Sequence, residues 1–160
     1  MSQGAQRSED FGSAFDAAFA ELRARIGSAC DAEAEWAAGA AAAIRAAFAW
    51  SAAAPGAAQL LTNDALAQGG EGFARYERMV AYIAALLAPG RELAEHGERL
   101  PEITERAMAS GVAMLVAQRL SLGREAELPA LAGEAVQFVL TPYLGTAGAR
   151  RLALGGDGSS

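Results

Sequence analysis

Apolar side chains recur at helical spacing along almost the whole chain. The first clear stripe steps by four, four, three and four residues, through Phe11, Phe15, Phe19, Leu22 and Ile26. A repeat of 3.6 residues places such positions on one face of an α-helix. The same period returns in five later segments, at about 36–53, 57–68, 73–87, 100–123 and 125–144. No stretch alternates apolar and polar residues for long enough to form a strand. The sequence therefore predicts an all-α domain, a bundle of six helices.

Glycine and proline mark the boundaries between these helices. Breaks are expected at Ala-Pro-Gly 54–56, Gln-Gly-Gly-Glu-Gly 68–72 and Pro-Gly 89–90. Gly123 is well placed just after the end of the fifth helix, and Gly145 should stop the sixth, with one more turn after it. The polar residues 91–99 should add a short turn of helix. Residues 10–153 are thus expected to form one domain, between polar, disordered ends at 1–9 and 154–160.

Charge and composition exclude several classes of function. The net charge is −6, all 13 basic residues are arginine, and no basic patch occurs. Binding to the phosphate backbone needs clustered positive charge, so we expect no nucleic-acid binding by this chain alone. With one cysteine and one histidine, neither a disulfide within the chain, nor a metal site, nor a cofactor is predicted. No leader and no uninterrupted apolar run long enough for a membrane span is present, which predicts a cytoplasmic protein with no membrane partner.

No group of residues in the sequence resembles a catalytic site. His96 lies in a polar segment without a serine, cysteine or aspartate at a recognisable spacing, and it is expected on the surface. Cys30 ends an apolar stripe, where a buried thiol is more typical than a nucleophile. We therefore predict that the chain is not an enzyme. An enzyme would require His96 to face a cavity beside a carboxylate.

The fifth helix, 100–123, carries apolar residues on more than one face. Ile103, Ala107 and Met114 share one side, and other sides carry Met108, Val112, Leu115, Val116 and Leu120. A helix that covers a single small core needs only one apolar stripe. One explanation is a central position in a monomer. The other, which we favour, is a homodimer in which the last two helices of each copy form a four-helix interface.

Candidate interface residues follow from that second explanation. They are Val112, Leu115, Arg119 and Leu122 from the fifth helix, with Leu131, Phe138 and Leu140 from the sixth. Arg119 is expected to pair at the rim with Glu125 or Glu134 of either copy. Such a pair at the surface contributes about 0–1 kcal/mol.

Several short motifs along these segments are similar to one known family. Leu100-Pro101-Glu102 opens one helix, Gly111-Val112 lies within it, and Gln-Arg-Leu follows at 118–120. A Leu-Pro start at 128–129 and a closing Pro-Tyr-Leu-Gly at 142–145 complete the pattern. Together they resemble the last two helices of the effector-binding and dimerisation domain of TetR-type transcriptional regulators. Segments 8–22 and 60–87 resemble that domain's earlier helices, so the likeness covers about residues 9–152.

The resemblance implies a regulator that binds a small apolar molecule between its middle helices and the fifth helix. Residues expected to line that site are Phe48, Trp50, Asn63, Tyr76, Met79, Ile83 and Met114. Each of them could instead be ordinary core. The helix-turn-helix unit through which the family binds DNA has no counterpart in this sequence, so gene control is implied for a parent protein only. The alternative is a purely structural dimerisation module without a ligand, which would have a completely filled middle bundle.

Overall fold

The fold is described by a computed structural model of residues 3–155, and these residues form helices and no strands. The elements are α1 (Gln3–Asp31), α2 (Trp36–Ala53), α3 (Pro55–Gln59), a π-helical turn η1 (Leu60–Asp64), α4 (Ala65–Gln68), α5 (Gly70–Leu87), α6 (Gly90–Leu93), the 3-10 turn η2 (Gly97–Arg99), α7 (Thr104–Ser121), the 3-10 turn η3 (Glu125–Glu127) and α8 (Leu128–Ala153). Because α3, η1 and α4 follow one another directly, the chain has six main helical segments. The all-α prediction is confirmed.

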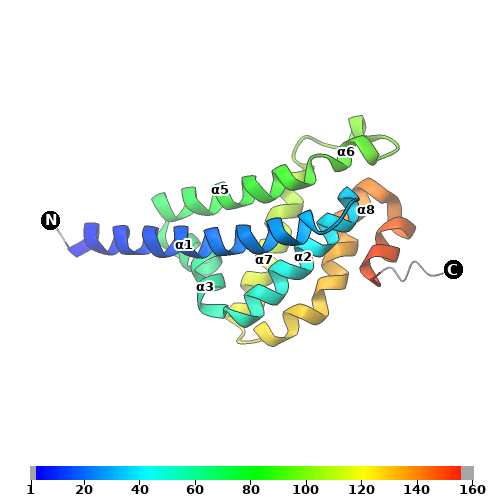
Figure 1. The fold of residues 1–160 in the computed structure, drawn as a ribbon. Helices are drawn as coiled ribbons and strands as arrows, with labels where there is room; N and C mark the ends of the chain where they lie inside the picture. Colours follow the sequence, from blue (N-terminus) through cyan, green and yellow to red (C-terminus); the bar gives the residue numbers. More distant parts are fainter. Residues whose placement is uncertain (1–2, 156–160) are drawn as a thin grey trace.

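Helix α2 is the centre of the bundle. It packs against α1 on one side and α8 on the other, while α5 runs beside α1 and α7 crosses behind them (Figure 1). Its inner face consists largely of small residues, among them the buried Gly39, Ala40, Ala41 and Ala43. These let neighbouring backbones approach closely: a Cβ added at Gly39 would lie 3.4 Å from the carbonyl oxygen of Cys30 in α1.

Several helix ends differ from the sequence prediction, and several agree. Helix α1 begins at Gln3, so residues 3–9 are helical where a disordered end was expected. Helix α7 begins at Thr104 rather than at 100, because Thr104 Oγ1 donates to the Pro101 carbonyl, 2.7 Å away, in a turn before the helix. Positive φ at Gly123 confirms the predicted stop after α7. Within α8 the backbone at Gly145 is non-helical, with φ 70° and ψ 171°, so the helix is kinked there and continues for two more turns to Ala153. The expected disorder at 156–160 lies outside the described residues.

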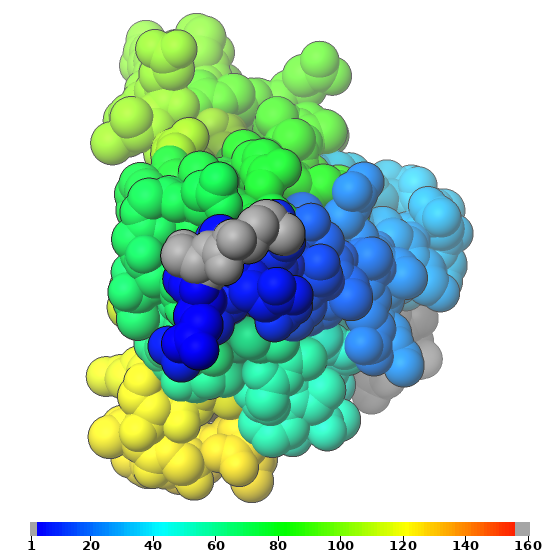
Figure 2. All heavy atoms as spheres, turned by 90° about the vertical axis from the view of Figure 1, so that its left-hand side faces the viewer, coloured from blue at the N-terminus to red at the C-terminus, as the bar shows by residue number. Residues whose placement is uncertain are grey.

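A buried ionic network fastens the segment between α5 and α7. The Nε and Nη2 atoms of Arg91 each donate to the Glu105 carboxylate at 2.8 Å, and Nη1 donates to the Leu100 carbonyl at 2.9 Å. The Tyr143 hydroxyl of α8 donates to the same carboxylate at 3.2 Å. Burial has the largest single effect on the pKa of Glu105 and would raise it, but the hydrogen bonds from Arg91, a backbone hydrogen bond, the charge of Arg91 and the Tyr143 hydroxyl together hold that pKa below its usual value. The network holds in place residues 88–103, which protrude from one end of the molecule (Figure 2).

Candidate functional site

A largely apolar cavity lies among the end of α1, the first half of α2 and the end of α5. Its volume is about 450 Å³. Ligand sites for drug-sized molecules commonly span roughly 300 to 1,000 Å³ and are mostly apolar, so this cavity is large enough for a small molecule. The apolar lining comes chiefly from Ile26, Trp36, Ala43, Ile44, Ile83 and Leu86.

Few polar groups line this cavity, and none of its lining residues is basic. Glu33 and Glu35, in the connection between α1 and α2, are both exposed. Burial, followed by the nearby charge of Asp31, raises the pKa of the Cys30 thiol, which therefore stays protonated at neutral pH. The thiol donates to the Gly39 carbonyl at 3.6 Å. Cys30 is thus a lining residue of the cavity and a contact between α1 and α2.

Trp36 holds one wall of the cavity in place. Its indole Nε1 donates to the Leu86 carbonyl near the end of α5, 2.9 Å away, and its ring packs edge-on against Tyr143 of α8. The side chain thereby links the start of α2 to both neighbouring helices. Trp36 was not among the residues predicted from the sequence to bind a ligand.

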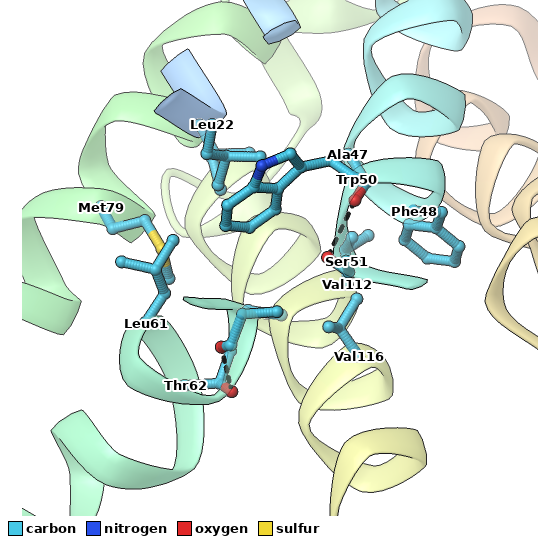
Figure 3. Close-up of a pocket in the computed structure, with 13 residues that line it drawn as sticks. Leu22, Ala47, Phe48, Trp50, Ser51, Leu61, Thr62, Met79, Val112 and Val116 are labelled. Carbon is cyan, nitrogen blue, oxygen red and sulfur yellow. Dashed lines mark hydrogen bonds between the residues drawn. The ribbon is translucent and has the colours of Figure 1, made fainter. Parts of the chain in front are cut away.

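A second, smaller cavity lies deeper, among α1, α2, η1, α5 and α7. Its volume is about 50 Å³, which suits a few water molecules or the end of a larger ligand. Figure 3 shows Trp50 extending across it from α2, with Leu22, Leu61, Met79 and Val116 around it. The two cavities share three lining residues, Ala47, Ile83 and Val112.

The polar groups of the smaller cavity are unequally satisfied. The Ser51 hydroxyl donates to the Ala47 carbonyl and the Thr62 hydroxyl to the Ala58 carbonyl, each at 2.8 Å (Figure 3). The indole N–H of Trp50, by contrast, is buried and has no hydrogen-bond acceptor within residues 3–155. An unpaired buried donor is rare in folded proteins and calls for an explanation.

Four of the seven residues predicted to bind a ligand lie at these cavities. Phe48, Trp50 and Met79 line the smaller one, and Ile83 lines both. Phe48 is fully buried, and its ring also packs into the core against α8. The apolar spacing in α2 and α5 was sufficient to place these four on inward faces.

The remaining three line neither cavity. The Asn63 side chain donates to the Ala117 carbonyl at 3.0 Å, so its amide fastens η1 to α7 instead of facing a ligand. Tyr76 is packed in the core among α1, α5 and α7 residues, and burial raises the pKa of its hydroxyl. Met114 is 52% exposed on the outer side of α7. The predicted inward orientation of Met114 was wrong. Apolar residues lie on several sides of α7, so the sequence pattern does not show which side faces the core.

The predicted dimer interface divides into two sets. Leu122 and Phe138 are 57% and 52% exposed, and Leu115, Arg119 and Leu131 are half-buried. The remaining two predicted interface residues do not lie on the exposed face of the molecule. Val112 lines both cavities, and Leu140 is completely buried in the core between α2 and α8.

The outer face of α7 and α8 carries an apolar strip. A Cβ added at Gly111 would lie 3.3 Å from the Phe138 ring, so this glycine makes room for the phenylalanine. Met114 lies one turn along α7 from Gly111 on the same side. At the end of the strip Arg119 Nε lies 3.4 Å from Glu127, instead of the predicted Glu125 or Glu134.

The arrangement around His96 does not form a catalytic pair. Its imidazole is 57% exposed at a surface pocket of about 550 Å³, and Nδ1 lies 3.9 Å from the Glu98 carboxylate. That distance is too long for an orienting hydrogen bond. Within residues 3–155, no cluster of three or more histidine, cysteine or acidic side chains could hold a metal ion. No single described helix has the length and apolar character of a membrane span; only α2 together with Pro55–Gln68, bent by 110°, meets both criteria as a pair.

Comparisons of the chain with models of protein families, with curated proteins and with solved structures find no match.

Proposed function

We propose that this chain is a cytoplasmic effector-binding and homodimerisation domain of the type found in TetR-type regulators. The observation that carries the proposal is the 450 Å³ apolar cavity among α1, α2 and α5. A ligand that fills this cavity would remove apolar surface from water, and each Å² of apolar surface removed contributes roughly 25 cal/mol of favourable free energy. The motifs at 100–145 that resemble this family support the same reading.

The cavity touches the helix best placed to transmit a signal. Ile26 and Cys30 of α1 line it together with residues of α2 and α5. The N-terminal end of α1 extends beyond the rest of the bundle (Figure 1), where a DNA-binding unit of a parent protein would attach. A ligand that binds one arrangement of α1 and α5 more tightly would increase its population, by no more than the difference in affinity.

The exposed strip on α7 and α8 supports the homodimer. Met114 of α7, Phe138 of α8 and Leu122, which directly follows α7, are each more than half exposed. Exposed apolar patches on small proteins commonly mark interaction surfaces. A second copy related by a two-fold axis would cover this strip with the same strip.

Blocking the cavity tests the ligand-binding part. In α2, Ala43 lines the cavity, whereas Ala49 is exposed on the outer side of the same helix. We expect Ala43→Phe to weaken binding of the neutral fluorescent dye N-phenyl-1-naphthylamine at least tenfold, and Ala49→Phe to leave it unchanged. Equal dye binding by both variants and the unchanged protein would refute the proposed site.

Native mass spectrometry tests the homodimer. We expect a species of twice 16.4 kDa. Phe138→Glu should convert it to monomer, because the charge would be buried without a partner, while Ala24→Glu on the exposed side of α1 should not. A monomer at micromolar concentration for the unchanged chain would contradict the dimer.

A structural dimerisation module without a ligand remains the second candidate. The observation in its favour is that the middle of the bundle is almost filled: the cavity among α2, η1, α5 and α7 has a volume of only about 50 Å³. This candidate predicts a dimer that carries no extra mass and binds no dye, so the two experiments together separate it from the first.

A further inference from the structure

The N–H group of Trp50 is a hydrogen-bond donor that the fold has buried without an acceptor. The side chain is 6% exposed, and no acceptor of residues 3–155 lies within hydrogen-bonding distance of Nε1. Burying a donor without a partner is unfavourable, because its hydrogen bonds to water are lost and not replaced. Trp36, the other tryptophan, is different: its N–H is paired with the Leu86 carbonyl.

The surroundings of Trp50 offer no substitute acceptor. Ser51 and Thr62 line the same small cavity, and each hydroxyl donates its proton to a carbonyl of its own helical segment, but neither hydroxyl oxygen accepts from Trp50 Nε1. In Figure 3 the indole nitrogen lies on the edge of the ring beside Leu22, away from both hydroxyls. All other residues lining this cavity are apolar.

The small cavity is adjacent to the large one. Ala47, Ile83 and Val112 line both cavities, so these three side chains lie where the two cavities meet. The large cavity has the volume for the body of a ligand, and the small one has room for only a few atoms. A ligand that fills the first and extends past these three side chains would bring its end toward Trp50.

Charge limits what that end can be. No basic residue lines either cavity, and Glu33 and Glu35 lie beside the larger one. A carboxylate or phosphate on the ligand would therefore be buried without a positive partner. A neutral oxygen, such as that of a ketone, aldehyde or ester, accepts a hydrogen bond without this cost.

We propose that the Trp50 N–H binds the carbonyl oxygen of a neutral, otherwise apolar ligand whose body occupies the large cavity. This inference rests on the proposed ligand-binding function and names its ligand class. Trp50 is then the donor that distinguishes a carbonyl compound from a hydrocarbon of the same shape.

A matched pair of probes tests the inference. The ketone 2-nonanone and the alkene 2-methyl-1-nonene have the same shape, but only the ketone carries an acceptor oxygen. By displacement of N-phenyl-1-naphthylamine, we expect the unchanged protein to bind the ketone about tenfold more tightly, as one added hydrogen bond allows. Trp50→Phe should abolish that preference. Ala49→Phe, on the exposed outer side of the same helix, should retain it.

Two further measurements do not depend on the affinity of the variants. The chain has two tryptophans, so its indole N–H groups give two NMR signals that the variants assign. The ketone should move the Trp50 signal downfield and the alkene should not. Without ligand, both Trp50→Phe and Trp36→Phe should lower the thermal midpoint, because each removes part of a packed ring, and Trp36→Phe should in addition leave the Leu86 carbonyl unpaired.

Each outcome bears on one of the two proposals. Equal binding of ketone and alkene would overturn the role of Trp50 and leave the ligand cavity standing. If neither probe displaced the dye or bound, the ligand-binding function and this inference would fail together.

Discussion

Replacing Glu105 by glutamine should destabilise the protein in a way that depends on pH. The Glu105 side chain is 10% exposed and accepts hydrogen bonds from Arg91 Nε, Arg91 Nη2 and the Tyr143 hydroxyl. Glutamine has nearly the same shape, but it offers one acceptor oxygen and no charge. Glu105→Gln would therefore lose one of the two parallel bonds to Arg91 and the charge that strengthens the others.

The size of the effect follows from these contacts. A hydrogen bond to a charged group contributes about 1.5–3 kcal/mol. Arg91 retains the carbonyl of Leu100, so its charge is not left without acceptors and the larger penalty of a fully orphaned ion does not apply. We expect Glu105→Gln to lower the free energy of unfolding by about 2 kcal/mol at neutral pH. For a chain of this length that lowers the thermal midpoint by about 4–8 °C.

The pH dependence gives the decisive test. The folded-state pKa of Glu105 lies below the ordinary 4.5, so its stabilisation is fully present above that value. As the pH falls through 4.5 the unfolded chain takes up the proton first, and the stabilisation is lost as the pH approaches the folded-state pKa. Glutamine does not titrate, so the difference between the two proteins should shrink as the pH falls from about 6 to about 3.

Urea unfolding followed by circular dichroism at several pH values measures this difference directly. Glu95→Gln provides the control, because Glu95 is exposed and makes no ion pair within residues 3–155. That variant should match the unchanged protein at every pH. A difference in the free energy of unfolding between Glu105→Gln and the unchanged protein that stays constant from neutral to acid pH would refute the ionic account of the network.

Two other substitutions test backbone contacts. Arg45→Met should cost about 1.5 kcal/mol and increase hydrogen exchange at the end of α8, because Arg45 Nη2 donates to the Leu152 carbonyl at 2.5 Å; unchanged exchange there would contradict this. Gly97→Ala should cost about 2–3 kcal/mol by urea unfolding, since the added Cβ would lie 1.8 Å from the Arg91 carbonyl oxygen. Gly56→Ala, in open space within α3, should instead be neutral or stabilising.

The helices could be predicted from sequence because their signals are local. The stripe from Phe11 to Ile26 and the glycine at 123 each depend on a few neighbouring residues, and the structure agrees with them. The first residue of α7 was harder to predict from the sequence. Pro101 suits a first helical turn, yet here it belongs to a turn whose carbonyls are held by Arg91, ten residues earlier. Such a contact has no signature in a short window of sequence.

The site was only partly predictable, because a cavity is a property of packing rather than of periodicity. Phe48, Met79 and Ile83 could be placed inward from their spacing. The larger cavity depends on what its lining lacks: Ala43 and Ala47 of α2 face the end of α5 without filling the space between. Periodicity identifies such alanines as buried but cannot indicate that the space before them is empty.

Apolar residues lie on several sides of α7, which either a central position in a monomer or a dimer interface could explain. The prediction from sequence favoured the dimer interface. Ala109 and Ala113 pack toward α1 and α5, and Val116 packs toward α2 and α8, so most of the helix is central within a single chain. Only the side carrying Gly111 and Met114 is left for a partner. The dimer proposal therefore depends on that narrower strip together with Phe138. This is why Phe138→Glu is the substitution that should separate two copies, whereas a charge at Val112, which lines both cavities, would disrupt the fold of one.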